Sequence, residues 1–568
     1  MSRHGFYDKT TRPWVNARLT NASIVGHTTT ASAKIWVRAW EEDNAGEPTA
    51  GQGLYWLIVS TQPIPAELGQ PEVVLAEGGR VSVVLSAPSG NRTVLSALVS
   101  AQSISLQYET DLTGTLAITG LQPGTRYYYG LFAGFERSQR WELGDEEPLF
   151  FRTRPANAAS VTFGVFSCHQ PFTKHGVQNI GMFAALRQEL DHLGADHVLA
   201  IGDQIYSDGF SDGDIWSWLK KVQGEPELEL ADLVSWYRDV YRGFWGFKSL
   251  QALFAHYPSY MMLDDHEIVD GWGSSTRQEI ARTKLGLGAL LHPTRAEQLV
   301  GNMFDAAKFV YEEYQHAHNP DTAPGVYDYG FEAGFVKTYV LDMRSAHDIT
   351  QPDGERLLGR AQFDRLAAWL AEPLGPCKAV FIVSPVPVVH FRPEIVNSGL
   401  LQLPLLGAKD DLRDEWEHET NLTERTKLLE LVSQFSAQHA VPVVFLSGDV
   451  HMSASFELWD RKRPTAHVYQ LTTSGITYSG AARLPAIPSL DAGVTHKNAP
   501  LSGTDERWFV HRLQTDAHHN FAIVQCSLDA AAQPTISWSL HIPGTNEQSV
   551  TRLERLRVYP STKARGVP

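Results

Sequence analysis

Cysteine is scarce in this chain, and long apolar runs are missing. Cys168, Cys377 and Cys526 are the three cysteines among 568 residues, and no two of them form a CxxC pair. An odd number at this spacing excludes a disulfide framework. No uninterrupted apolar run approaches the roughly 18 to 20 residues that a membrane span needs, so we predict no membrane span. Internal repeats and low-complexity tracts are also missing.

Positive charge is in short supply as well. The chain has 48 Lys and Arg against 64 Asp and Glu, which gives a net charge of -16. Non-specific binding to nucleic acid or to an anionic membrane needs a surplus of Lys and Arg, so we expect neither as a partner. The first residues contain no apolar segment of a secretory signal. We therefore expect a cytoplasmic protein, although a secreted chain without its signal would have a similar composition.

The apolar residues that are present suffice for large cores. The hydrophobic fraction is 43%, with 15 Trp, 19 Tyr and 25 Phe, and the length suggests roughly two to four domains. Apolar and polar residues alternate over 33–39 and 115–119, as in half-buried strands. A turn signal at 121–125 precedes an aromatic run at 126–132. We predict that residues 1–155 form an all-β sandwich domain of the fibronectin or immunoglobulin type.

The pattern changes after residue 156. Apolar runs at 161–166 and 197–201 flank an amphipathic helical pattern at 180–193, which predicts a βαβ unit. Strands and helices continue to alternate, so we predict an α/β domain over residues 156–568. The further predicted strands are 260–263, 335–341, 379–383, 441–446, 521–524 and 535–540, and the further predicted helices lie near 230–255, 300–317, 361–371 and 423–437.

Two long segments of this domain have no regular pattern. They cover residues 386–420 and 474–515, and each follows a predicted strand. Loops of this length are usually functional lids or disordered insertions, and we predict lids over the site. The first segment contains acidic residues for which two roles stay open, adding to the site or only covering it. These residues are Asp410, Asp411, Asp414, Glu415 and Glu417.

Polar residues gather where four predicted strands end. In a sheet with helical crossovers, the carboxyl ends of the strands converge on one crevice where ligands bind. Carboxylate, imidazole, thiol and phenol groups that meet there would form a site for more than one metal ion. Four such groups in series predict a metal-dependent hydrolase. They are Ser167-Cys168-His169-Gln170, Gly202-Asp203-Gln204-Ile205-Tyr206, Asp264-Asp265-His266-Glu267 and Gly448-Asp449-Val450-His451.

The first two groups contain three candidate metal ligands, and for two of them other roles stay open. Asp203 follows a glycine that permits a tight turn, and its two oxygens can bridge two cations. Tyr206 is either a core aromatic or a phenolate ligand of a trivalent metal. Cys168 is a buried apolar residue, a soft thiolate ligand or a nucleophile. Nearby carboxylates would raise the pKa of its thiol unless a cation offset them, which favours ligation over nucleophilic attack.

The last two groups are dense in ionisable residues. Asp264-Asp265-His266-Glu267 puts three carboxylates and an imidazole in four consecutive positions, which is costly unless cations neutralise them. A solvated loop is the alternative. Asp449 and His451 alternate, so in an extended segment they would lie on the same side and form a metal clamp.

Together the four groups supply six or seven ligands, enough for two ions. Two cations roughly 3.5–4 Å apart lower the pKa of bound water towards ~7 and hold the attacking and leaving oxygens of an in-line displacement. An imidazole beside them can stabilise charge on a phosphoryl group or protonate the leaving oxygen.

The order and content of these groups resemble the calcineurin-like metallophosphoesterases, and more closely their alkaline phosphatase D (PhoD-like) branch. The wider superfamily carries D-x-H, G-D-x-x-D, G-N-H-E and G-H-x-H in this order. Here Cys168 and Tyr206 stand in place of aspartates, and Asp265 and Asp449 in place of asparagine and histidine, as in that branch. Further matches are Tyr241-Arg242, Leu250-Gln251, Asp342-Met343-Arg344, and Leu358-Gly359-Arg360-Ala361-Gln362.

The resemblance implies a four-layer α/β/β/α catalytic domain that follows an N-terminal β-sandwich. It also implies two or more metal ions. An iron(III)-type ion would be held by Cys168, Asp203, Tyr206 and His451.

A second cation would, by the same resemblance, face Asp203, Asp265 and Asp449. Calcium is the ion that the family suggests, with Mn, Zn, Mg or Co as other choices. Asp270 is a further candidate for this divalent site. His266 corresponds to the histidine that faces the phosphate.

We therefore predict a metal-dependent phosphoric ester hydrolase that acts on a small-molecule phosphate ester. A metal-activated hydroxide would attack phosphorus in line, with no covalent enzyme intermediate. The predicted catalytic residues are His266, Asp203 and Arg344, and Arg344 would hold substrate oxygens. Phosphomonoesterase and phosphodiesterase activity both stay open, and the sequence gives no oligomeric state.

Two other functions compete with this prediction. The first is a different metallohydrolase reaction on the same ligands. The second is an inactive hydrolase-like chain that binds a glycan or protein through its β-domain. Intact Asp203, His266 and Asp449 weigh against the second, because a degenerate site would have lost one of them.

Overall fold

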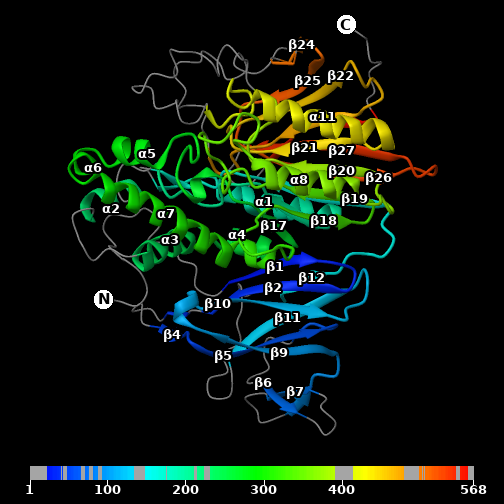
Figure 1. The fold of residues 1–568 in the computed structure, drawn as a ribbon. Helices are drawn as coiled ribbons and strands as arrows, with labels where there is room; N and C mark the ends of the chain where they lie inside the picture. Colours follow the sequence, from blue (N-terminus) through cyan, green and yellow to red (C-terminus); the bar gives the residue numbers. More distant parts are fainter. Residues whose placement is uncertain are drawn as a thin grey trace.

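The computed structural model shows a mixed α/β protein with a β-rich N-terminal region (Figure 1). The predicted lids fall partly outside the residues that it describes, since residues 391–412, with Asp410 and Asp411, and residues 479–497 are not among them. The described residues are 22–39, 41–42, 48–64, 71–75, 81–86, 92–133, 148–173, 176–209, 214–222, 230–390, 413–478, 498–501, 503–504, 506–544 and 550–560.

The N-terminal region is built from antiparallel strands. Its strands β2, β10 and β11 confirm the strands predicted at 33–39, 115–119 and 126–132. A three-stranded sheet has the order β1 (Ala22–Thr28), β2 (Ser32–Arg38), β10 (Thr113–Thr119), and a four-stranded sheet has the order β12 (Phe150–Arg152), β11 (Arg126–Ala133), β5 (Gly53–Ser60), β9 (Leu98–Leu106). Smaller elements are β3 (Glu41–Glu42), β4 (Pro48–Ala50), β6 (Pro71–Leu75), β7 (Val81–Ser86), β8 (Arg92–Val94) and the 3-10 helix η2 (Tyr108–Thr110).

A seven-stranded sheet follows. Its β13–β16 and β16–β17 pairs are parallel, and helix α1 (Gly181–Leu193) connects β13 to β16, which confirms the predicted βαβ unit. Helix α1 ends where Gly194 adopts a left-handed φ of 60°. The strand order is β17 (Ser259–Met261), β16 (His197–Ala200), β13 (Ser160–Phe166), β26 (Phe521–Leu528), β27 (Pro534–Pro543), β28 (Val550–Arg552), with β29 (Leu556–Tyr559) also on β27.

The second large sheet has eight strands. Strands β19, β20, β21 and β23 run parallel, and helices α8 (Gly359–Ala371) and α11 (Leu422–His439) lie between them in sequence. The strand order is β18 (Tyr329–Ala333), β19 (Val336–Val340), β20 (Ala379–Val383), β21 (Val443–Ser447), β23 (Val468–Thr472), β22 (Ser453–Asp460), β25 (Trp508–Asp516), β24 (Asn498–Pro500).

Most remaining helices lie between β16 and β18 in the chain. The helix predicted near 230–255 is two helices, α3 (Leu230–Phe244) and α4 (Lys248–Phe254), because the chain becomes extended at Phe247. The others are α2 (Ile215–Val222), the 3-10 helix η3 (Asp265–Glu267), α5 (Arg277–Lys284), α6 (Leu287–Leu291), α7 (Pro293–Tyr314) and the 3-10 helix η4 (His316–His318). A small hairpin joins β14 (Phe172–Thr173) to β15 (Gly176–Val177).

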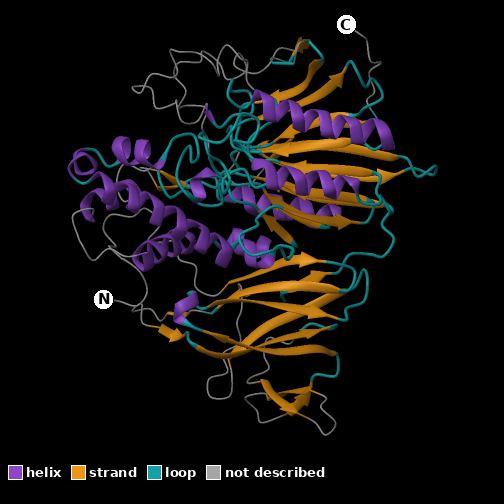
Figure 2. Cartoon of the chain, viewed as in Figure 1, coloured by secondary structure: helices purple, strands orange, loops and turns teal. Residues whose placement is uncertain are grey.

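The two large sheets share one apolar core. Phe163 of β13 meets Phe381 of β20 edge to face, with ring centroids 5.3 Å apart. The outer side of the seven-stranded sheet packs with α1, α3, α4 and α7, and the outer side of the eight-stranded sheet packs with α8 and α11. Figure 2 shows loops gathered at one end of these sheets, where the carboxyl ends of the parallel strands lie. In the described part of the chain, no helix is long and apolar enough to cross a membrane.

Candidate metal centre

Backbone contacts bring the predicted strand-end groups together. The backbone N–H groups of Cys168 and His169 donate to the carbonyls of Gly202 and Asp203, at 3.3 and 2.8 Å. The first two groups are thereby joined side by side. Gly202 has a φ of 93°, and a Cβ there would lie 2.6 Å from the Cβ of Asp264. Glycine is therefore required where the second and third groups meet.

The backbone is strained at four of the predicted metal ligands. Cys168, Asp203, Asp449 and His451 have φ values of 55°, 56°, 62° and 54°. Left-handed conformations of non-glycine residues cost on the order of 1–3 kcal/mol each and concentrate at functional sites. The prediction that Asp449 and His451 alternate along an extended segment is wrong, because both adopt this left-handed conformation.

Four carboxylates converge at the strand ends. One oxygen from each of Asp203, Asp264, Asp265 and Asp449 lies within 4.8 Å of the others. We call these four residues the carboxylate cluster. All four are buried or nearly so, and Oδ1 of Asp203 has no hydrogen-bond partner among the described residues. An unpartnered buried oxygen in an all-oxygen donor set fits a hard cation.

The electrostatics of the cluster also fit a cation. Burial raises the pKa of Asp449 well above its ordinary value, and Asp264 and Asp265 raise it further. Burial likewise raises the pKa of Asp203 far more than the nearby His266 lowers it. Both shifts arise because negative charges are held together away from water. A bound cation would remove the repulsion that causes them.

Thiol and phenol groups meet at the same carboxylate. The Sγ of Cys168 lies 3.4 Å from Oδ2 of Asp203, and the hydroxyl of Tyr206 donates to that oxygen at 3.0 Å. The Oγ of Ser474 is 3.1 Å from the thiol. Burial raises the pKa of Cys168, and Asp203 and Asp449 add to this effect. A thiol in these surroundings is a poor nucleophile, whereas a metal would make it a thiolate ligand.

His451 is connected to Tyr206 through the ring of Tyr478. Its ring lies edge to face on Tyr478, with centroids 4.0 Å apart. Tyr478 in turn stacks on Tyr206 at 5.7 Å. The backbone N–H of His451 donates to Oγ of Ser474 at 2.8 Å, so Ser474 contacts both His451 and Cys168. Neither Ser474 nor Tyr478 was predicted, because no local pattern marks either one.

His266 is held by an aspartate that the sequence did not single out. Its Nδ1 lies 3.0 Å from Oδ1 of Asp208, and its ring covers Tyr206 at a centroid distance of 3.9 Å. Its Nε2 lies 3.7 Å from Oδ1 of Asp270. Burial lowers the pKa of His266, but Asp265, Asp203 and Asp208 raise it well above its ordinary value. In the metal-free protein these carboxylates therefore favour the protonated imidazole.

Arg344 lies inside a buried network of carboxylates. Its Nε contacts Oδ1 of Asp264 at 2.6 Å, and its Nη1 contacts Oδ2 of Asp414 at 2.6 Å. The side chain of Arg344 is fully buried. Of its nitrogens, Nη2 makes no hydrogen bond with the described residues and lies 3.8 Å from Asp265. Asp414, from the first predicted lid, is thus in direct contact with Arg344.

Glu267 connects two backbone segments of the site, at 203–204 and at 264. Its carboxylate accepts the backbone N–H groups of Asp203, Gln204 and Asp264, at 3.0, 2.6 and 3.0 Å. The Nε2 of Gln315 donates to it at 3.0 Å. The sequence placed Glu267 in the third strand-end group but assigned it no role, and its partner Gln315 is distant in sequence. Through these hydrogen bonds Glu267 positions the loop that carries Asp203.

Comparisons with known proteins identify the family of this chain. A model of the PhoD-like phosphatase family matches residues 163–511, more than half of the chain and all four strand-end groups. A solved structure of PhoD has a similar fold, with a TM-score of 0.58 and 15% identity over 96% of this chain and 92% of that chain.

Two further solved structures match too weakly to indicate a shared fold. A calcium-binding mutant of Bacteroides uniformis beta-glucuronidase 2 matches with a TM-score of 0.21 and 8% identity over 95% of this chain and 60% of that chain. A glycosyl hydrolase family 2 member from Bacteroides cellulosilyticus matches with a TM-score of 0.20 and 9% identity, over 94% of this chain and 68% of that chain. Both TM-scores are too low to indicate a shared fold. No curated protein matches. On the family match, the predicted resemblance is confirmed, and the chain belongs to the PhoD-like phosphatase family.

Proposed function

We propose that this chain is a metal-dependent phosphoric ester hydrolase. The carboxylate cluster with the thiol and phenol on Asp203 is the observation that carries the proposal. Four buried carboxylates with a single arginine beside them, among the residues that the structure describes, are costly unless further cations bind there. Family membership supports a phosphoesterase, and the cluster supports metal dependence.

Two ions would divide the ligands between them. Cys168 and Tyr206 suit a soft or trivalent ion such as iron(III), with Asp203 and His451 completing its ligands. Asp265 and Asp449 suit a hard divalent ion such as calcium, with Asp203 shared between the two ions and Asp270 near the second. Such ions lower the pKa of bound water and neutralise charge that develops on phosphorus.

His266 would handle the proton of the reaction. Its Nδ1 donates to Asp208, which leaves the protonated Nε2 to donate to a phosphoryl oxygen or to the leaving alcohol. The hydrogen bond to Asp208, which holds no ion in this proposal, raises the pKa of His266 and so favours this proton. The Nη2 of Arg344 would hold a further substrate oxygen.

The finer architecture belongs to the same proposal. The shared core between the large sheets, with helices on both outer sides, supports a four-layer α/β/β/α catalytic domain over residues 156–568. The antiparallel sheets before it support a separate β-sandwich domain over residues 1–155.

Metal content and turnover test the proposal together. We expect mass spectrometry of the purified protein to find iron and a divalent ion, with an absorption band from thiolate or tyrosinate bound to iron. The protein should hydrolyse bis(p-nitrophenyl) phosphate or p-nitrophenyl phosphate, and chelation should abolish this activity. Full activity after removal of all metal would overturn the proposal. Activity with zinc or manganese alone would overturn only the iron assignment.

A further inference from the structure

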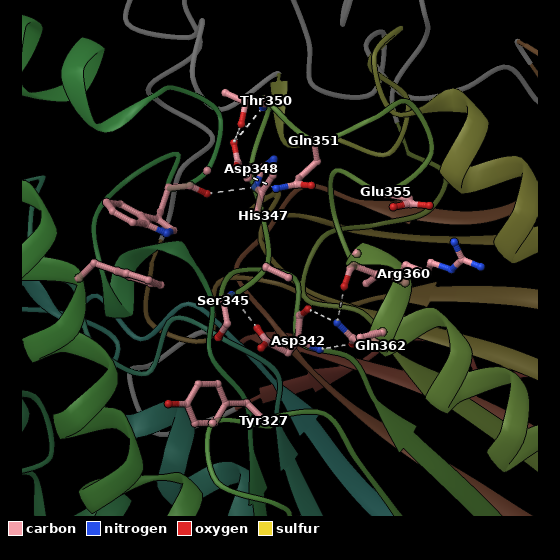
Figure 3. Close-up of a pocket in the computed structure, with 18 of the residues that line it drawn as sticks. Tyr327, Asp342, Ser345, His347, Asp348, Thr350, Gln351, Glu355, Arg360 and Gln362 are labelled. Carbon is pink, nitrogen blue, oxygen red and sulfur yellow. Dashed lines mark hydrogen bonds between the residues drawn. The ribbon is translucent and has the colours of Figure 1, made fainter.

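A large cavity lies beside the carboxylate cluster without including it. Its volume is about 850 Å³, within the range of small-molecule sites. One wall is the loop from residues 342 to 358, between β19 and α8, and another contains Trp272, Phe304 and Tyr327. None of the four cluster carboxylates lines it. Figure 3 shows His347 on the loop wall, between Asp348 and Ser345.

His347 presents one unused nitrogen at this wall. The imidazole is only 6% exposed, and its Nδ1 lies 3.2 Å from the backbone carbonyl of Trp272. A carbonyl can only accept a hydrogen bond, so Nδ1 carries the hydrogen and Nε2 keeps a lone pair. Nε2 has no partner among the described residues. A buried acceptor without a donor requires an explanation, and because His347 lines the cavity, a ligand bound there would supply the donor.

The imidazole stays neutral, so it remains an acceptor. Burial and the nearby Arg344 lower the pKa of His347 to about 3. A molecule that pairs with Nε2 must therefore bring an O–H or N–H donor, and it gains nothing from a negative charge at this point.

The acidic groups on the inner wall are already occupied. Asp328 is paired with Arg365 and accepts from the hydroxyl of Tyr339 at 2.5 Å. Asp342 accepts the backbone N–H groups of Arg344 and Ser345 at 3.0 and 2.9 Å. Because Asp328 and Asp342 already have these partners, they do not need a cation from the cavity.

Aromatic surface completes the cavity. Trp272 stacks on Phe304 with ring centroids 4.6 Å apart, and both rings line the space. An aromatic face beside a neutral acceptor suits a molecule with hydroxyl groups on an otherwise apolar carbon skeleton.

The backbone next to Trp272 is shaped around the imidazole. Gly273 has a φ of 96°, and a Cβ there would lie 2.2 Å from Cγ of His347. Any side chain at Gly273 would displace the ring. The position and tautomer of His347 are therefore fixed by Trp272 and Gly273 together.

The cavity is linked to the cluster by a single carbonyl. The carbonyl of Trp272 that accepts from His347 also accepts from Nη1 of Arg344 at 3.4 Å. Arg344 in turn contacts Asp264 of the carboxylate cluster. The carbonyl of Trp272 thus connects His347 to Arg344, which contacts the carboxylate cluster.

We propose that this cavity is a second binding site, which takes a hydroxyl-bearing molecule whose O–H donates to Nε2 of His347. The hydroxyl comes from the alcohol part of the phosphate ester or from a separate molecule that modulates the enzyme. Both sources share one chemistry. Binding does not depend on the proposed function, because it is measurable without turnover.

Binding of neutral polyols tests the site directly. We would titrate the full chain with glycerol and with myo-inositol, using calorimetry and saturation-transfer NMR. A dissociation constant of about 1–10 mM is expected for a few hydrogen bonds and limited apolar contact. His347→Phe keeps the ring but removes the acceptor, and should weaken binding at least tenfold. His439→Phe, on the exposed end of α11, is the matched control and should bind as the unmodified protein does.

A measurement on the unmodified protein guards against a variant that fails to fold. The ¹⁵N signal of Nε2 in His347 should shift when a polyol binds, and Gly273→Ala should weaken binding by moving the ring. Binding of neither polyol, or equal binding by His347→Phe, would overturn the proposal.

Kinetics then separate the two sources. With p-nitrophenyl phosphate as substrate, a polyol that raises KM alone identifies the cavity as the place for the substrate alcohol. A polyol that changes kcat identifies a separate modulator that acts through Trp272 and Arg344. Binding with no change in either parameter would overturn the link through Trp272.

Discussion

Buried carboxylates occur in two regions of this molecule with opposite surroundings. In the N-terminal region, Asp111 meets two arginines: Nη1 of Arg242 lies 2.6 Å from its Oδ1, and Nε of Arg38 lies 3.3 Å from its Oδ2. The hydroxyl of Tyr314 donates to the same carboxylate. In the carboxylate cluster, Arg344 is the one arginine that contacts any of the four described acids closely.

The pKa values of the carboxylates in the two regions shift in opposite directions. Burial alone would raise the pKa of Asp111, but Arg242 and Arg38 hold it below its usual range. Burial raises the pKa of Asp203 and Asp449, and their acidic neighbours add to the rise. Where a buried carboxylate serves the fold, the chain supplies its own cations. Where the chain leaves that charge uncompensated, as at Asp203 and Asp449, the carboxylates are consistent with the binding of external cations.

The largest effect should come from removing the shared carboxylate. Asp203→Asn should lower kcat/KM for bis(p-nitrophenyl) phosphate on the order of 1,000-fold or more, since loss of a single transition-state donor already costs 10²–10³. The melting temperature of the metal-free variant should not fall, because a repelled charge has been removed. Retained activity would refute the site, and a large loss of stability would refute the comparison.

The same substitution at Asp111 should act on the fold. Asp111→Asn leaves two arginines without their carboxylate and should lower the free energy of unfolding by about 3–5 kcal/mol. The control is Asp321→Asn, whose side chain is 94% exposed and pairs with Lys34, where about 0–1 kcal/mol is expected. Urea denaturation of both variants measures the difference. Equal stabilities would show that the arginines contribute nothing.

A smaller effect should separate metal binding from folding. Glu267→Gln weakens the support for the Asp203 loop and should reduce metal affinity about 10–100-fold, as loss of outer contacts at metal sites does. Activity should then recover with excess metal. The matched control is Glu424→Gln, since Glu424 is also buried and accepts two backbone N–H groups, from Leu357 and Leu358. Equal metal affinity of the two variants would argue against a positioning role for Glu267.

The smallest effect should be a pH dependence confined to the metal-free protein. Burial raises the pKa of Asp264 to about 6 and that of Asp414 to about 7, above the ordinary aspartate value of 3.8. The folded state thus binds more protons than the unfolded state between pH 4 and 7, so stability should fall as the pH rises through this window. Thermal melts with and without metal measure this. Metal should abolish the fall, and a rise in its place would contradict the assigned shifts.

Local sequence patterns predicted most of the helices and strands, and also which polar groups lie at the strand ends. The alternation in β2 and the helical spacing in α1 are local patterns, and each corresponds to an element of the structure. The convergence of the four groups followed from the rule that parallel strands end at one edge. Cys168 and Asp203 therefore meet as the motif order suggested.

The contacts that hold the site were beyond local patterns. Gln315 reaches Glu267 across 48 residues, and Asp414 reaches Arg344 across 70. Such pairs depend on how helices pack rather than on spacing in the chain. The error at Asp449 and His451 has the same origin: alternation describes a strand, but both residues lie beyond the end of β21 in a left-handed turn.

The left-handed backbone at Cys168, Asp203, Asp449 and His451 also bears on how this family changes over time. Glycine would relieve the strain at each position, so a lineage released from selection for turnover would gain stability by drifting towards glycine there. If these residues hold the proposed ions, we expect a relative with glycine at two or more of these positions to be more stable but inactive. Measuring the stability and activity of such relatives would test this expectation.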